Sequence, residues 1–92
     1  VDPLGVAEVI GKHGWVTVYP NPAKDKVMID FGGFSAATSV KVFDIFGRFS
    51  LQEVYRNSTN ASLNLASLSN AVYSIRVENE NGSFAGKLVI NR

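Results

Sequence analysis

The residue types that carry most enzyme chemistry are scarce in this chain. It has 92 residues, no cysteine and a single histidine, His13. A serine or cysteine triad needs a histidine base held beside its nucleophile, and His13 lies in a glycine-rich stretch that predicts no fixed geometry. Zinc sites draw mainly on histidine and cysteine ligands. We therefore predict no catalytic residue, no enzyme activity and no zinc site.

Other metal and cofactor sites lack their sequence signals as well. Asp25, Asp30 and Asp44 lie on separate segments, whereas a calcium loop gathers its carboxylates within about a dozen positions. Gly32 and Gly33 are not followed by a helical pattern, which a phosphate-binding loop requires. We predict neither a metal nor a cofactor.

Composition argues against several classes of partner. The formal net charge is +1 and lysine and arginine form no run, so nucleic acid and anionic membrane surfaces have no electrostatic support. No apolar run approaches the roughly 20 residues that span a bilayer, and we predict no bilayer-spanning segment. With 46% hydrophobic and 18% charged residues, the composition is typical of one small globular domain.

The elements that must position any functional residue are short strands. From residue 15 onward, apolar residues recur at every second position, which is the period of a strand with one buried face. Seven segments show this pattern: 15–19, 26–31, 39–44, 49–56, 61–65, 71–78 and 83–91. Their number and spacing predict an all-β fold, a single seven-stranded antiparallel Ig-like β-sandwich with almost no helix.

The same alternation predicts which side chains form the core. The inward positions are Val16, Val18, Val27, Ile29, Val40, Val42, Leu63, Leu65, Tyr73, Ile75 and Val77. Residues 1–14 show no such period and contain three of the eight glycines. We interpret 1–14 as a linker with room for one short strand, and 15–92 as the folded domain.

Turn signals separate the strands. The pair Asn81-Gly82 is a strong hairpin signal between the last two strands. A slip in the apolar phase between Leu51 and Val54 predicts a bulge near 52–53. The segment Asp44-Ile45-Phe46-Gly47 fits a type I turn, with Asp at its first position and a glycine free to adopt positive φ.

The segment Tyr19-Pro20-Asn21-Pro22 is a stiff corner between the first two strands. Each proline lacks a backbone N–H and fixes φ near −65°, so neither can lie inside a sheet ladder. By itself the segment is explained as an ordinary strand-to-strand turn. A functional interpretation of this corner depends on three later segments of the chain.

Four segments, in order, resemble the C-terminal sorting domain of the type IX secretion system. The family's Tyr-Pro-Asn-Pro corner is matched by Tyr19, Pro20, Asn21 and Pro22, and its Val-x-Val-Tyr/Phe-Asp-x-x-Gly-Arg segment by Val40, Val42, Phe43, Asp44, Gly47 and Arg48. Its Leu-x-x-Gly-Val-Tyr-x-x-x-Val segment is matched by Leu68, Val72, Tyr73 and Val77, with Ala71 in place of the glycine. Its lysine-containing last strand is matched by Lys87, Leu88, Val89 and Ile90.

The resemblance covers residues 15–92 and implies recognition rather than reaction. It implies a domain that folds in the periplasm and directs a covalently attached N-terminal cargo through the outer-membrane translocon and its shuttle components. A sortase-like surface peptidase would then remove the domain near the 1–14 linker, leaving the cargo at the cell surface or outside. The implied recognition residues are Tyr19, Pro20, Asn21, Pro22, Asp44, Gly47, Arg48, Lys87, Leu88, Val89 and Ile90.

Two other functions fit the sequence. The domain could be an Ig-like structural spacer of a bacterial surface protein. It could instead be a carbohydrate-binding module that uses Trp15, Tyr19 and Tyr73 as a platform, although Tyr73 is in phase with Ile75 and Val77, which favours a buried position.

Overall fold

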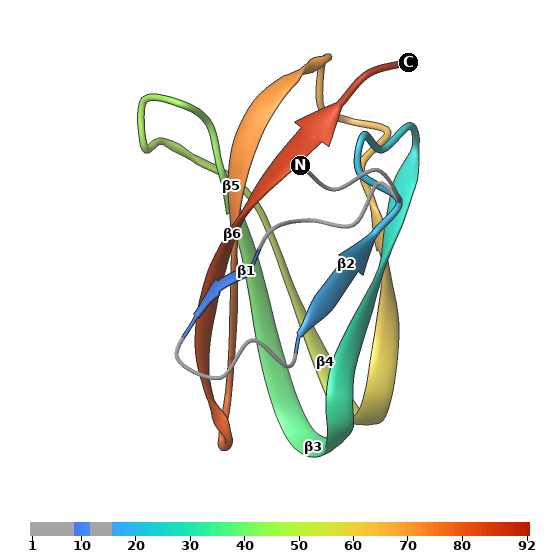
Figure 1. Cartoon of the computed structure of the whole chain (residues 1–92), viewed down its shortest axis with the longest axis vertical. Coiled ribbons are helices and arrows are strands. Elements are labelled where there is room, and N and C mark those ends of the chain that lie inside the picture. Colours follow the sequence, from blue (N-terminus) through green and yellow to red (C-terminus); the bar gives the residue numbers. More distant parts are fainter. Residues whose placement is uncertain (1–8, 12–15) are drawn as a thin grey trace.

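A computed structural model describes residues 9–11, for which it gives the backbone, and residues 16–92. Within these residues it contains six strands and no helix (Figure 1): β1 (Val9–Gly11), β2 (Thr17–Tyr19), β3 (Lys26–Phe43), β4 (Phe49–Asn64), β5 (Ala71–Asn79) and β6 (Gly82–Ile90). In this part of the chain there is accordingly no helix long and apolar enough to cross a membrane.

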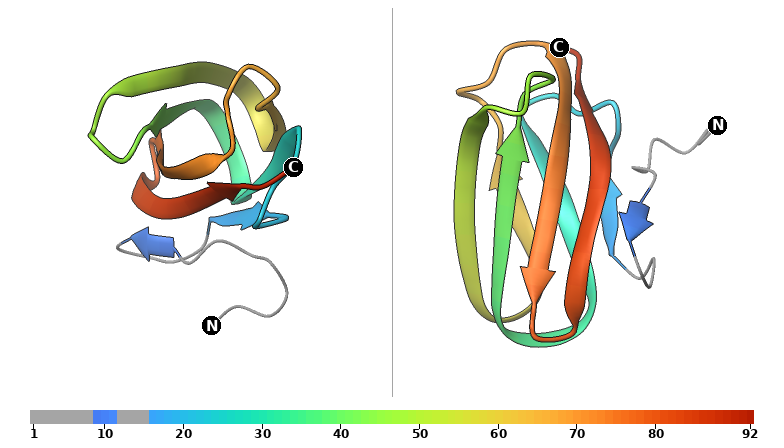
Figure 2. Two further views of the ribbon diagram at one scale, coloured as in Figure 1. Left: turned by 90° about the horizontal axis from the view of Figure 1, so that it is seen from above. Right: turned by 90° about the vertical axis from the view of Figure 1, so that its left-hand side faces the viewer.

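Two long strands, β3 and β4, build both layers of the sandwich. They pair antiparallel along their length, with an irregularity between Asp30 and Ser35, and there the strands curve from one layer into the other (Figures 1 and 2). The early part of β3 pairs with β2 and the end of β4, and its later part pairs with β5 and the start of β4. The strand order is β1-β6-β5-β3-β2, with β4 beside β3.

The bend in β3 is held by local and distant contacts. Gly32 adopts a φ of 74°, which a residue without Cβ does at little cost, and its N–H donates to Asp30 Oδ1 at 2.8 Å. Glu80, from the β5–β6 turn, accepts hydrogen bonds from Ser35 Oγ at 2.8 Å and Ala36 N at 2.9 Å. The N–H of Ala36, with the Ser35 hydroxyl, holds the pKa of Glu80 below its usual range.

The fold class is as predicted, an all-β Ig-like sandwich, but the count of seven strands is not confirmed. The expected strands 26–31 and 39–44 are two parts of β3, and 49–56 and 61–65 are two parts of β4. The predicted strand 26–31 ends just before Gly32 and Gly33. Instead the chain continues through the bend as strand, because Glu80 binds the polar groups of the bend itself. Val9–Gly11 adds a strand that pairs with β6.

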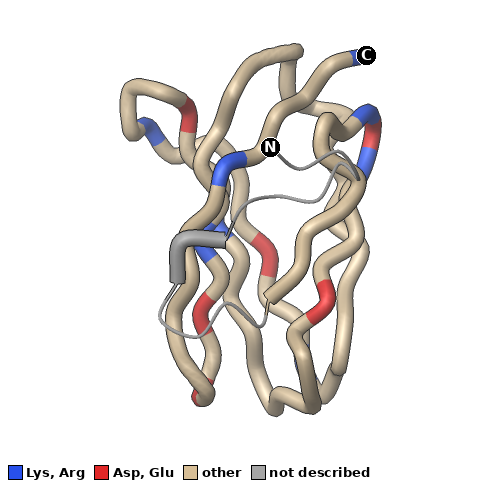
Figure 3. The backbone as a smooth tube through the Cα atoms, viewed as in Figure 1, with Lys and Arg blue, Asp and Glu red and all other residues tan. Residues whose placement is uncertain are grey.

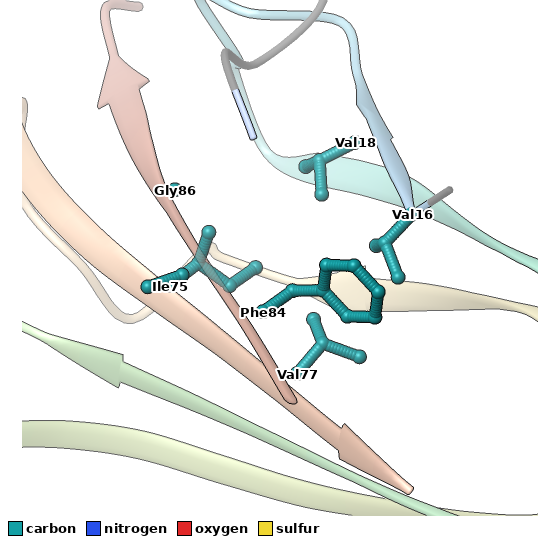
Figure 4. A pocket seen from close by; sticks show the side chains of 7 residues that line it. Val16, Val18, Ile75, Val77, Phe84 and Gly86 are labelled. Atoms are coloured by element: carbon teal, nitrogen blue, oxygen red, sulfur yellow. The ribbon is translucent and has the colours of Figure 1, made fainter. Parts of the chain in front are cut away.

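Every side chain predicted for the core is buried. The exposed fraction is 6% for Tyr73 and 2% or less for the ten others. The core also includes Ala23, Phe31, Ala61, Phe84, Leu88 and Ile90. Figure 4 shows Val16, Val18, Val77 and Phe84 around a gap of about 10 Å³, which is at the lower limit for one water molecule. This part of the interior is therefore packed and offers no space for a ligand.

The predicted hairpin is confirmed and the predicted bulge is wrong. Asn79 pairs with Gly82, so the β5–β6 turn consists of residues 80–81 and starts one residue before the Asn-Gly pair. Residues 51–54 of β4 pair with β3 in regular register, and the irregularity lies at Ser50. Residues 52–54 are all exposed on this edge strand, so their apolar phase carried no information about register.

Candidate recognition surface

The corner between β2 and β3 lies against β6, although the two are almost 70 residues apart in sequence. Asn21 Oδ1 accepts a hydrogen bond from Val89 N at 2.9 Å, and Asn21 Nδ2 donates one to Lys87 O at 3.2 Å. Just after the corner, Ala23 N donates to Val89 O at 2.7 Å and Asn91 N donates to Ala23 O at 2.9 Å. The Tyr19–Pro20 and Asn21–Pro22 peptide bonds are both cis. Two of the four motif segments are thus in direct contact.

Arg92 joins the same group of segments. Its Nε lies 2.8 Å from Asp25 Oδ1, while Nη1 and Nη2 donate to the carbonyl oxygens of Leu68 at 2.6 Å and Leu65 at 2.7 Å. Its backbone N–H also donates to Asn70 Oδ1 at 3.1 Å. A planar guanidinium can donate in several directions at once, which an ammonium on a flexible stem does less well. This one side chain therefore ties the loop after the corner to the β4–β5 loop.

The β3–β4 loop is shaped by Asp44. Its Oδ1 accepts from the backbone N–H groups of Phe46 and Arg48, both at 2.9 Å, and its Oδ2 accepts from Arg48 Nε at 2.8 Å. The N–H of Arg48 is the main cause of the lowered pKa of Asp44. Gly47 closes the turn with a φ of 80° and donates its N–H to Asp44 O at 2.9 Å. The turn predicted for 44–47 is therefore present.

This loop displays two large apolar side chains. Ile45 is 69% exposed and Phe46 is 75% exposed, and the Arg48 guanidinium lies 5.2 Å from the centre of the Phe46 ring. Val72, at the start of β5, is 40% exposed. A groove of about 380 Å³ is lined by this loop, the β4–β5 loop and the start of β5. The apolar side chains were not predicted from sequence, because they occupy the variable positions of the Asp-x-x-Gly-Arg segment.

Tyr73 supports the β4–β5 loop from inside. Its hydroxyl donates to Ser69 O at 2.7 Å, and the side chain is 6% exposed. The ring is therefore not available to stack on a sugar. Of the other two residues of the proposed aromatic platform, Tyr19 is 40% exposed, and Trp15, like His13, lies outside the described residues. A carbohydrate platform built on these three side chains has no support.

The last strand divides its motif residues between two faces. Leu88 and Ile90 are 0% and 1% exposed and belong to the core. Lys87 is exposed and Val89 is half-buried, and they pair across the sheet with Ser74 and Val72. In the folded domain Leu88 and Ile90 can act only through packing, so Lys87 and Val89 are the side chains of this segment that a partner can touch.

Parts of all four motif segments lie at one end of the sandwich. In Figure 1 and the right-hand view of Figure 2 the corner, the β3–β4 loop, the β4–β5 loop and the end of β6 are all in the upper part of the molecule. We call this the motif end, and define it as residues 19–25, 44–48, 65–73 and 87–92. Figure 3 shows lysine and arginine interspersed with acidic residues here rather than one charge of a single sign. The described residues contain no group of three side chains that could hold a metal.

The structure thus presents a β-sandwich with a structured, partly apolar end. A family model described as the secretion system C-terminal sorting domain matches residues 17–91. The chain belongs to this family, and its general role is that of a type IX sorting signal. The family consists of sorting signals and not of enzymes. Membership in it implies attachment to an N-terminal cargo and secretion outward across the outer membrane.

Structural comparison agrees with the fold. The crystal structure of a DUF3244-family protein from Bacteroides vulgatus, described as having an immunoglobulin-like β-sandwich fold, superposes with a TM-score of 0.78. The two sequences are 12% identical, and the match covers 97% of this chain and 100% of that one. At this identity the likeness concerns the fold alone. A search of curated protein sequences gives no match.

Proposed function

We propose that the domain directs its cargo through the outer-membrane translocon of the type IX system, and that the translocon and its shuttle components bind the motif end. One observation carries the proposal. Segments spread over 74 positions, from Tyr19 to Arg92, meet at one end of the fold, and this end displays Ile45, Phe46 and Val72 to solvent. Exposed apolar side chains on a rigid platform are the usual basis of a protein-binding surface.

The proposal extends to the steps before and after transport. The domain passes through the periplasm in a folded form, and once it is outside a sortase-like surface peptidase cleaves the chain near the 1–14 linker and anchors the cargo at the cell surface. We assign 1–14 as the linker and 15–92 as the sorting domain. Within the linker, Val9–Gly11 pairs with β6, and residues 1–8 and 12–14 lie outside the described residues. Segments that precede compact domains are common sites of proteolysis.

The whole chain, fused behind a periplasmic reporter, tests the function. In a host with the type IX system we expect the reporter at the cell surface or in the medium. In the same host without the translocon we expect it in the periplasm. Equal export from both hosts would contradict the proposal and leave the structural spacer as the better explanation.

A matched pair of phenylalanines tests the surface. Phe46 at the motif end and Phe34 at the bend of β3 are 75% and 61% exposed. Changes at exposed positions usually alter stability by about 0.5 kcal/mol or less, so Phe46→Ser and Phe34→Ser should both fold. We expect Phe46→Ser to reduce export of the reporter and Phe34→Ser to leave it unchanged. Equal export of the two variants would exclude the motif end as the binding surface.

A further inference from the structure

The last strand, β6, has one edge that no neighbouring strand covers completely. Its inner edge pairs with β5 from Gly82 to Ile90. On the outer edge, β1 pairs with residues 84–86, and among the described residues no strand pairs with β6 from Lys87 to Ile90; Ala23 makes only an isolated bridge to Ile90. An open edge of an apolar strand is a site at which another chain can add a strand.

The Asn21 side chain covers this edge in the way a peptide group would. A carboxamide carries an acceptor and a donor in one plane, and Asn21 uses both, on Val89 N and Lys87 O. Pro20 and Pro22, on either side, have no N–H to offer. The donor for Lys87 O therefore comes from a side chain, and Ala23 continues the pattern with its own backbone groups.

We infer that Asn21 is a positioning residue of the recognition surface. It closes the outer edge of β6 and fixes the strand, so that a partner protein contacts Lys87 and Val89 through their side chains and does not add a strand of its own. This inference rests on the proposed function, because it describes how the motif end is recognised. It also explains why an asparagine stands between the two prolines of the corner.

Site-specific amide hydrogen exchange tests the structural half on the purified chain. In Asn21→Ala we expect the Val89 amide to exchange at least ten-fold faster than in the unmodified chain. The Leu88 amide faces β5 rather than the corner, and it should keep its rate. Equal acceleration of both amides would indicate general destabilisation, and an unchanged Val89 rate would show that Asn21 does not protect this edge; either result overturns the inference.

Export of the reporter tests the functional half. We expect Asn21→Ala to reduce export at least five-fold, at unchanged levels of folded fusion protein. Asn60→Ala is the control, because Asn60 is exposed, lies outside the motif end, and donates from its side chain to its neighbour in sequence, Thr59 Oγ1, at 3.4 Å. Lys87→Ala changes an exposed side chain and should also reduce export. If Asn21→Ala does not fold, this variant tests whether a partner recognises the side chains of β6.

The outcomes separate this inference from the proposed function. If the unmodified fusion is exported and Asn21→Ala is exported equally well or better, the edge does not need to be closed and the inference is wrong, while the sorting function stands. Export of Lys87→Ala at the normal level would likewise exclude side-chain recognition of β6. If the unmodified fusion is not exported at all, the sorting function fails, and the exchange experiment alone still decides whether Asn21 protects the edge.

Discussion

Adjacent residues of β6 provide a direct test of the register that places this strand. Leu88 is fully buried opposite Tyr73, whereas Val89 faces outward and is half-buried. Leu88→Ala removes three carbon atoms from the core, which costs about 2.4 kcal/mol in transfer free energy at roughly 0.8 kcal/mol per carbon, and the cavity adds to it. We expect a total loss of about 3–4 kcal/mol. Val89→Ala removes two half-buried carbons and should cost about 0.8 kcal/mol.

These losses are large on the scale of the domain. A chain of this length has a free energy of unfolding of roughly 5–14 kcal/mol, so Leu88→Ala should remain folded but with a much lower Tm. At about 4–8 °C per kcal/mol, the Tm should fall by about 12–30 °C for Leu88→Ala and by about 3–6 °C for Val89→Ala. Far-UV circular dichroism during thermal and urea unfolding measures both variants.

The assigned burial of β6 is wrong if the two losses of unfolding free energy agree within about 0.5 kcal/mol, or if the loss is larger for Val89→Ala. Equal losses would mean that the two faces of β6 are buried alike. A larger loss for Val89→Ala would mean that β6 presents its other face to the core, since a shift by one residue exchanges the two faces of a strand. Leu88 and Ile90 would then be the exposed side chains, and the assignment of Lys87 and Val89 to a partner would be withdrawn.

Three further predictions, made with four substitutions, concern the turns and loops. Gly47→Ala should cost roughly 1–2 kcal/mol of unfolding free energy, because the φ of Gly47 is 80°. Gly33 has equal space for a Cβ but no positive φ, so Gly33→Ala should be neutral or stabilising by up to about 1 kcal/mol. Thermal unfolding compares the two variants, and equal effects would exclude backbone strain at Gly47. Tyr73→Phe should cost about 1 kcal/mol in urea unfolding, because it removes a partly buried hydrogen bond. An unchanged urea midpoint would show that this bond does not stabilise the fold. The lowered pKa of Glu80 means that its carboxylate stabilises the fold above the ordinary value of 4.5 and that this contribution is lost as the pH falls through the lower, folded-state pKa. Glu80→Gln should therefore flatten the fall of Tm in this acid range, and an unchanged pH profile would assign it to other carboxylates.

Sequence alternation predicted the core well because most strands bury one face. Val27 and Ile29, for example, alternate with residues on the opposite face of the strand. The two-residue period of a strand therefore predicts which of these side chains are buried. The method failed where burial does not alternate. The segment 52–54 is exposed on both faces of an edge strand, so the apolar phase there predicted a bulge at the wrong place.

The site was predictable as a set of segments but not as a surface. The corner, the Asp44 turn and the last strand were identified from residue types. Their meeting at one end was not, because it depends on contacts between distant residues such as Asn21 with Val89 and Arg92 with Leu65. The bend of β3 depends in the same way on Glu80, which lies 45 positions from Ser35. Such pairs leave no local pattern in one sequence.

In the β3–β4 loop and at Asn21, the motif residues that hold the shape differ from the side chains that a partner can touch. Asp44, Gly47 and Arg48 are occupied in shaping their loop, and Asn21 is occupied in binding β6. The large exposed apolar side chains of the loop, Ile45 and Phe46, stand at its variable positions. In this loop the motif therefore specifies the shape, and the residues between its fixed positions supply the contact surface.

This division has a consequence for specificity. If the fixed residues hold the loop in shape, then exchanging Ile45 and Phe46 for other apolar residues keeps both the shape and the apolar character, and export should continue at a similar level. Replacing both with serine keeps the shape but removes the apolar surface, and export should fall while the Tm stays within a few degrees. Replacing Asp44 with alanine removes three hydrogen bonds to its carboxylate, so it should reduce export even though Ile45 and Phe46 are intact. A loop recognised only through its fixed residues would give the opposite order, with the double serine variant exported normally.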